Sequence, residues 1–178
     1  MTAASSVAEA FAEAVAALVG EPDVADVLAH LVGDCAAVMG AEAVAILARD
    51  ERDGLSLLTA SSHRASELEL LQIQGSAGPC IDVIESNQAL SVSGADLIRE
   101  RWQHVGDAIV KAGFESVEAY PMRWRGTLLG GLNVFRATAP VGEPDAVTGQ
   151  AFADIATLAV IYSMRSPPSR PPAGSTRH

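Results

Sequence analysis

The two cysteines are the side chains of this chain with the greatest potential for covalent chemistry. Cys80 follows Gly78 and Pro79, which fit the first positions of a short helix. A thiol in the first turn of a helix is close to unpaired backbone N–H groups, which can lower its pKa and make it nucleophilic. No basic residue or second cysteine is near Cys80 in the sequence, so burial as a small apolar residue is the favoured interpretation. Cys35 belongs to an apolar helical stripe and is predicted to be buried in the same way.

Histidines could supply metal ligands, but their spacing does not favour this. His30, His63, His104 and His178 are scattered along the chain. No H-x-x-x-H spacing places two of them on one face of a helix. The sequence therefore predicts no metal site.

The stretch from Glu115 to Phe135 organises the chain and is predicted to form two β-strands joined by a tight turn. Its bulky and β-branched residues flank Arg125-Gly126, a dipeptide suited to a hairpin turn. Alternation places Glu118, Tyr120, Met122 and Trp124 on one face of the first strand. If that face lines a pocket, Glu118 is suited to orient a polar ligand; otherwise it is a solvated strand charge. Which face lines the pocket stays open.

The glycine pair Gly130-Gly131 interrupts the second strand of this hairpin. Glycine weakens a strand interior and often marks a close approach to the backbone. We expect the last helix of the chain to pack there, with the approach of a ligand as the alternative.

The remaining chain must supply the elements that position these side chains. Apolar residues recur at helical or alternating spacing over most of it. In chain order, the predicted elements are helices at 5–20 and 22–40, strands at 41–48 and 55–60, a short helix from 78, a strand at 89–92, a helix at 96–113 capped by Asp96, the 115–135 hairpin and a final helix ending at 165. Ser62 to Gln74 is ambiguous, because Leu68, Leu71 and Ile73 fit one side of a short helix while the rest is polar; we predict a mobile surface segment. The final helix is apolar nearly all round, so we expect the sheet to cover one side and a partner subunit another.

Composition excludes several classes of function. The chain has 178 residues, with 12 Lys+Arg against 22 Asp+Glu and a formal net charge of −10. Because a chain with this negative charge repels phosphate backbones and anionic lipid surfaces, we expect neither direct nucleic-acid binding nor membrane binding. No basic residue precedes Arg49, which argues against a secretory signal and predicts a cytoplasmic protein.

Three motifs stand out: Gly78-Pro79-Cys80-Ile81-Asp82, Arg101-Trp102, and the hairpin with Tyr120-Pro121-Met122 and Leu129-Gly130-Gly131-Leu132-Asn133. Together with the order of elements, these motifs resemble a GAF domain, in particular the GAF modules of actinobacterial GAF–ANTAR regulators. The resemblance implies an α+β fold: a single domain over residues 5–165, with a central antiparallel sheet of five to six strands. Terminal helices would pack on one face, and short helices with a pocket on the other. Residues 166–178 are predicted to be a disordered Pro-rich tail in place of the RNA-binding ANTAR domain.

The resemblance further implies a regulatory or sensory role without enzymatic activity, in signal transduction or transcription regulation. We expect a homodimer through the N- and C-terminal helices and a pocket for an unidentified small molecule. The expected pocket residues are Cys80, Ile81, Ile84, Trp102, Glu118, Tyr120, Met122 and Asn133.

Two alternatives remain open, as does a minor cofactor hypothesis. One alternative is a thiol-dependent reductase of the free methionine sulfoxide reductase type, with Cys80 reactive and Cys35 as resolving thiol. The other is an interaction scaffold with a vestigial pocket, which binds a partner through the final helix or the tail. Some GAF sensors bind haem, for which His63 or His104 would be the ligand, but a solvated histidine is favoured and we expect no cofactor.

Overall fold

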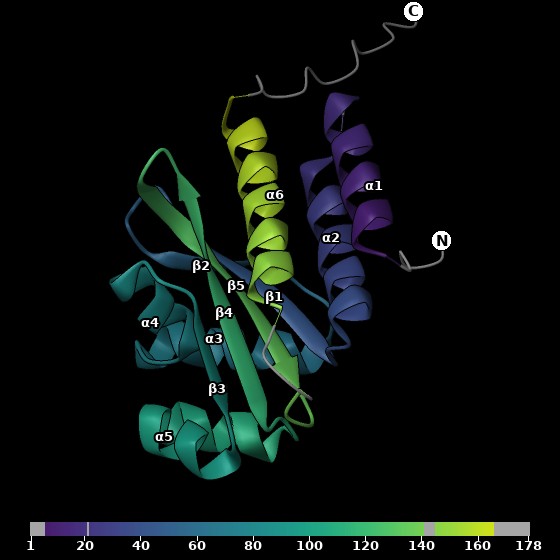
Figure 1. The fold of residues 1–178 in the computed structure, drawn as a ribbon. Helices are drawn as coiled ribbons and strands as arrows, with labels where there is room; N and C mark the ends of the chain where they lie inside the picture. Colours follow the sequence, from purple (N-terminus) through teal and green to yellow (C-terminus); the bar gives the residue numbers. More distant parts are fainter. Residues whose placement is uncertain (1–5, 21, 141–144, 166–178) are drawn as a thin grey trace, which may run out of the picture.

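The fold is built on a five-stranded antiparallel sheet, which the computed structural model shows with helices on both faces (Figure 1). The structure describes residues 6–20, 22–140 and 145–165; the predicted tail and Ser5 lie outside these ranges. The strands are β1 (Ala43–Arg49), β2 (Leu55–Ala60), β3 (Leu90–Ser93), β4 (Ser116–Trp124) and β5 (Thr127–Arg136). Their spatial order is β2-β1-β5-β4-β3. The predicted α+β class and antiparallel sheet are confirmed.

The hairpin predicted between Glu115 and Phe135 forms β4 and β5. Arg125 and Gly126 connect the strands with φ angles of 50° and 84°. Positive φ at both central residues is what a two-residue hairpin turn requires. Strand β5 is the central strand of the sheet, pairing with β4 on one side and β1 on the other.

Three helices cover one face of the sheet: α1 (Val7–Val19), α2 (Val24–Met39) and α6 (Ala146–Arg165) (Figure 1). Ser6 caps α1 by accepting a hydrogen bond from the Glu9 N–H, and Asp23 caps α2. Gly40 ends α2 in the left-handed conformation, as a helix C-terminus favours. These caps confirm the predicted limits of the first two helices.

Helix α6 packs against α1, α2 and strands β4 and β5. Its predicted contact with the sheet is confirmed, and α1 and α2 cover a second side. Among the described residues, it alone has the length and apolar composition that a membrane-crossing helix needs. Those properties are also typical of a core helix, and the buried Phe152, Ala153 and Ala156 belong to the core under the sheet.

The opposite face carries α3 (His63–Gly75), α4 (Pro79–Ser86) and α5 (Ala95–Lys111). The short-helix alternative for Ser62 to Gln74 is confirmed, because Ser62 caps a 13-residue helix there. The prediction of a surface segment was wrong, because one side of this helix is buried. Its buried side includes Glu69 and Gln72, whose polarity conceals the apolar stripe in the sequence.

Helix α5 departs from prediction in two details. Gly94, and not Asp96, is its N-cap, while Asp96 lies in the first turn. The helix also bends sharply at Gln103, where φ is 47° and ψ is −111°. The bend brings Gly106 so close to the Ile98 carbonyl that a Cβ at Gly106 would lie 2.2 Å from its oxygen.

The two faces of the sheet carry separate hydrophobic cores. Val44, Ile46, Leu132 and Val134 pack with α1, α2 and α6. Ala43, Ala45, Val117 and Phe135 pack with residues of α3 and α5. Because neighbouring residues of a strand point to opposite faces, this division assigns every side chain of the central strands to one layer.

A buried polar cluster as the candidate functional site

Four polar side chains meet between the sheet and helices α3 and α4. They are Glu69 and Gln72 from α3, Cys80 from α4 and Asn133 from β5, which we call the polar cluster. All four residues are 0% exposed. Glu69 and Gln72 are three positions apart, so both point inward from one face of α3. Cys80 and Asn133 were predicted pocket residues; Glu69 and Gln72 were not.

Two hydrogen bonds fix the geometry of the polar cluster. The Asn133 Nδ2 group donates to Glu69 Oε1 over 2.8 Å. Gln72 Oε1 accepts a hydrogen bond from the backbone N–H of Cys80 over 3.1 Å. Helix α4 has no cap from the side chain of its own N-cap, Gly78. Gln72 therefore supplies an acceptor that a helix N-terminus requires.

Three buried polar atoms of the cluster have no hydrogen-bond partner: Glu69 Oε2, Gln72 Nε2 and Asn133 Oδ1. Each unsatisfied buried polar group costs about 1–3 kcal/mol. Buried polar groups of folded proteins are nearly always paired, so three unpaired atoms in one place call for an explanation. They make the polar cluster the candidate functional site.

Burial also sets the protonation state of the polar cluster. It raises the pKa of Glu69 to about 8, although the nearby amides of Asn133 and Gln72 oppose the rise. Burial likewise raises the pKa of the Cys80 thiol well above its usual value, and the Glu69 charge adds to this rise. Desolvation therefore outweighs the effect expected from the start of α4, and the Cys80 thiol stays protonated at neutral pH.

Glycines make room for the cluster. A Cβ at Gly131 would lie 2.9 Å from Cys80 Sγ, and one at Gly78 would lie 2.4 Å from Gln72 Oε1.

A Cβ at Gly130 would lie 2.1 Å from the Leu47 carbonyl oxygen of β1. The prediction that the pair Gly130-Gly131 admits the last helix was wrong. Helix α6 uses its own Gly149, where a Cβ would lie 2.2 Å from Tyr120 Cζ.

Two of the sequence motifs contact each other beside the polar cluster. Asp82 Oδ2 accepts hydrogen bonds from Arg101 Nε over 2.9 Å and from Trp102 Nε1 over 3.1 Å. The buried Trp102 thereby satisfies its indole N–H, and α4 is tied to α5. The contact between residues 78–82 and 101–102 thus ties α4, which covers the cluster, to α5.

The structure divides the eight predicted pocket residues between the two faces. Cys80 and Asn133 lie in the polar cluster, and Trp102 belongs to the core on the same side. Ile81 and Ile84 are half-buried on α4. Glu118, Tyr120 and Met122 lie on the other face, in the layer of α1, α2 and α6, so they do not line a pocket with Cys80. The face with Val117 and Ala119 is the one that looks toward α3–α5.

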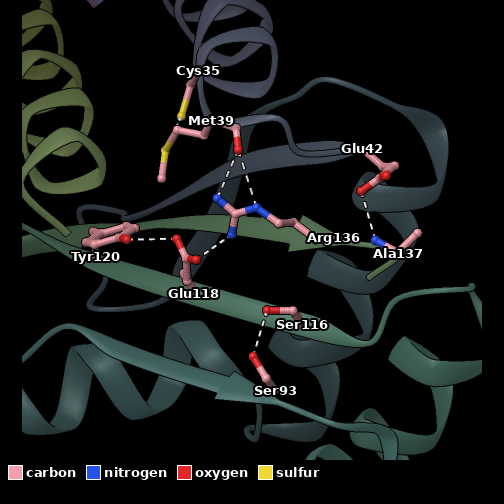
Figure 2. A network of polar contacts seen from close by, with 9 residues as sticks. All are labelled: Cys35, Met39, Glu42, Ser93, Ser116, Glu118, Tyr120, Arg136 and Ala137. Atoms are coloured by element: carbon pink, nitrogen blue, oxygen red, sulfur yellow. Dashed lines mark hydrogen bonds and ion pairs between the residues drawn. The ribbon is translucent and has the colours of Figure 1, made fainter. Parts of the chain in front are cut away.

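Glu118 takes part in a separate buried network under α2 (Figure 2). Its carboxylate pairs with Arg136 Nη1 and accepts a hydrogen bond from the Tyr120 hydroxyl over 2.8 Å. Arg136 Nη2 donates to the Met39 carbonyl at the end of α2 over 3.1 Å. The network joins β4 and β5 to α2. Sequence reasoning missed Arg136, because nothing in its spacing distinguishes it from a surface arginine.

Cys35 is buried beside this network (Figure 2). Burial raises the pKa of its thiol to about 12, although the Arg136 charge opposes that rise. Cys35 belongs to the core with α1, α2 and α6, whereas Cys80 packs against Gly131 on the other face. The sheet therefore separates the two thiols. Among the described residues, no three His, Cys, Asp or Glu side chains gather to hold a metal ion.

An open groove lies far from the polar cluster, between α1 and α2. It has a volume of about 710 Å³, and its lining includes Ala14, Ala17, Val27 and His30. None of the predicted pocket residues lines it. Its walls combine small apolar side chains with acidic residues of the same helices. Within the described part of the chain, no buried unpaired polar atom points to a ligand there.

The fold is shared with solved structures of low sequence identity. One is the GAF domain of the Acinetobacter phosphoenolpyruvate-protein phosphotransferase, with 15% identity, coverage of 88% of this chain and 93% of that chain, and a TM-score of 0.69. Another is the free methionine-R-sulfoxide reductase of Neisseria meningitidis, with 17% identity, coverage of 89% and 90%, and a TM-score of 0.66. A third is the phycoerythrobilin-bound GAF domain of a cyanobacterial phytochrome, with 13% identity, coverage of 88% and 95%, and a TM-score of 0.63.

At such identities, the likeness shows the fold alone. No curated protein matches the sequence. The model of the GAF domain family matches residues 23–160, which is well over half of the chain. The protein therefore belongs to the GAF domain family.

Proposed function

We propose that this GAF domain is a non-enzymatic regulatory module that binds a small molecule at the polar cluster. One observation carries the proposal: Glu69 Oε2, Gln72 Nε2 and Asn133 Oδ1 are buried together without partners. A site that served packing alone would gain stability from apolar residues in their place. GAF domains also occur in a cyanobacterial phytochrome and in a protein of Geobacter sulfurreducens that combines them with an HD domain, a setting that suits regulation.

Ligand entry requires a second arrangement of α3 and α4, because the residues of the polar cluster are 0% exposed. A ligand that satisfies the unpaired atoms stabilises the open arrangement over the closed one, and this difference in affinity drives the change. Ser76, Ala77 and Gly78 connect the two helices, with Ser76 in the left-handed conformation. The short link between α3 and α4 is therefore the place where the movement occurs.

Strand β5 offers a route from the polar cluster to the terminal helices. Asn133 contacts Glu69 on one face of the strand, and Arg136 contacts the Met39 carbonyl on the other. A shift of β5 that accommodates a ligand changes the Arg136 contact and the position of the α2 C-terminus. Chains of packed side chains and hydrogen bonds with two arrangements can carry energetic coupling between two sites.

The geometry does not favour the thiol reductase. Burial keeps the Cys80 thiol protonated, and Cys35 lies on the other face of the sheet. A resolving thiol must reach the reactive one, and here the sheet stands between them. No observation favours a catalytic role for any other described residue of the polar cluster.

We further propose that this chain is related to the GAF modules of GAF–ANTAR regulators. The contact of Asp82 with Arg101 and Trp102 supports this relationship, because it joins two motifs of that resemblance. We further propose that the protein is cytoplasmic, takes part in transcription regulation and forms a homodimer through α1 and α6. Exposed apolar side chains on these helices, including Val19 and Leu158, support the dimer.

Native mass spectrometry of the purified protein tests the ligand. We expect a small molecule to be carried by the wild type and lost from the Asn133→Ala variant. His30→Ala, in the groove between α1 and α2, is the matched control and keeps the molecule. Circular dichroism verifies that both variants are folded. If the wild type carries nothing, and a structure at high resolution shows ordered water on all three unpaired atoms, the sensor proposal fails.

A further inference from the structure

We propose that the ligand meets the polar cluster through a neutral group with an N–H donor next to a carbonyl acceptor, as in carboxamides, ureas and lactams. This inference rests on the proposed function and specifies the chemistry of its ligand. It follows from the hydrogen-bonding capacity that the cluster leaves unused.

The orientations of both amides are set by the bonds that they already make. Asn133 Nδ2 faces Glu69 Oε1, so its unpaired Oδ1 is an acceptor. Gln72 Oε1 faces the Cys80 N–H, so its unpaired Nε2 is a donor. With Glu69 protonated, these two amides therefore offer one donor and one acceptor to a ligand.

Glu69 supplies a second donor when it is protonated. Its Oε1 accepts from Asn133, so the proton resides on Oε2, the unpaired oxygen. Burial raises the Glu69 pKa to about 8, which favours the protonated form at neutral pH. The titratable neighbour is the Cys80 thiol from α4; Gln72 from α3 and Asn133 from β5 are neutral.

A carbonyl oxygen accepts two hydrogen bonds, and the adjacent N–H donates one. The carbonyl matches Glu69 Oε2–H and Gln72 Nε2–H, and the N–H matches Asn133 Oδ1. A carboxylate lacks the donor for Asn133 and would place a second negative charge in a buried site. An ammonium group lacks the acceptor for Gln72 and forces Glu69 to ionise.

Titrations with small probes, followed by NMR of the Gln72 and Asn133 side-chain amide signals, test this inference. The matched probes are acetamide and 2-pyrrolidinone; the mismatched probes are acetate and methylammonium. We expect both signals to shift with the matched probes only. Gln72→Leu should weaken binding about tenfold, which corresponds to one lost hydrogen bond. Gln88→Leu, at an exposed glutamine after α4, is the control and leaves the affinity unchanged.

The protonation state of Glu69 gives a second, independent test. Acetamide affinity should be constant between pH 6 and 7 and fall above pH 8, as Glu69 loses its proton. In the Glu69→Gln variant, which keeps a neutral donor, binding should persist and the fall should vanish. Both variants must show wild-type circular dichroism.

Two results would overturn the inference and are distinguishable. In the first result, methylammonium binds the wild type more tightly as the pH rises and does not bind Glu69→Gln. The ligand is then a cation, so the inference of a neutral group fails while the regulatory proposal stands. If no probe shifts either amide signal and native mass spectrometry also recovers nothing, both fail together.

Discussion

At the scale of single residues, Glu69 makes the stability of the fold depend on pH. Its pKa rises from an ordinary value of 4.5 to about 8 in the folded state. The contribution of Glu69 to the free energy of unfolding is therefore most favourable below about pH 4.5 and is lost as the pH rises toward 8. We expect the free energy of unfolding of the wild type to fall relative to Glu69→Gln across this window, by at most about 1.4 kcal/mol per pH unit.

Urea unfolding of both proteins at pH 5, 6, 7 and 8 measures this difference. Other titrating groups are common to the two proteins, so they cancel in the comparison. A wild type that gains stability relative to Glu69→Gln with rising pH would mean that the Glu69 carboxylate is favourably paired, contrary to its burial among neutral groups.

Gly131 tests how tightly α4 is packed on the sheet. A Cβ at this position lies 2.9 Å from Cys80 Sγ, so Gly131→Ala should destabilise the fold by about 1–3 kcal/mol through overpacking. Removing the sulfur relieves the clash. The double variant Gly131→Ala/Cys80→Ala should therefore lose less than the sum of the two single variants in urea unfolding. Gly33→Ala is the control, because nothing lies within 4 Å of its added methyl group. Additive losses would contradict the close contact.

At the scale of elements, the buried ion pair of Glu118 and Arg136 holds α2 on the sheet. The two side chains are 0% and 8% exposed, so removing one leaves the other charge buried and unpaired. Arg136→Met should lower the free energy of unfolding by about 3–5 kcal/mol. Arg99→Met, which breaks an ion pair with Asp107 at a 45%-exposed arginine, should change it by no more than about 1 kcal/mol. Equal losses in urea unfolding would contradict a structural role for Arg136.

Most elements could be predicted because their sequence signals are local. The Arg125-Gly126 turn, the Ser6 cap and the stripe that includes Cys35 each depend on a few neighbouring residues. Helix α3 was missed as a helix with a buried face because Glu69 and Gln72 occupy that face. Polar residues on a buried face defeat a pattern that relies on apolar spacing. Glu69 and Gln72, which break the apolar pattern of α3, are also the residues that form the candidate site.

The candidate site was only partly predictable, because it is assembled from distant parts of the chain. Cys80 and Asn133 came from motifs, while Glu69 and Gln72 have no motif of their own. Strand alternation correctly placed Glu118, Tyr120 and Met122 on one face. The choice between faces depends on how β5 pairs with β1 and which helices then cover each side. No local pattern contains that information.

At the scale of the whole molecule, the proposed dimer makes the layer of α1, α2 and α6 the output surface. Leu158 of α6 is 46% exposed and Val19 of α1 is 82% exposed. A glutamate in an apolar interface must be desolvated without a partner, so Leu158→Glu should shift the protein to monomer. Sedimentation velocity across a hundredfold range of concentration measures the change.

Leu97 provides the matched control, because it is 57% exposed on α5, which covers the opposite face of the sheet. Leu97→Glu adds the same charge without touching the proposed interface, so it should sediment like the wild type. If Leu158→Glu and Leu97→Glu behave alike, the terminal helices do not form the interface. In that case the path from Asn133 through Arg136 to the end of α2 would have to act within one chain or on a different partner.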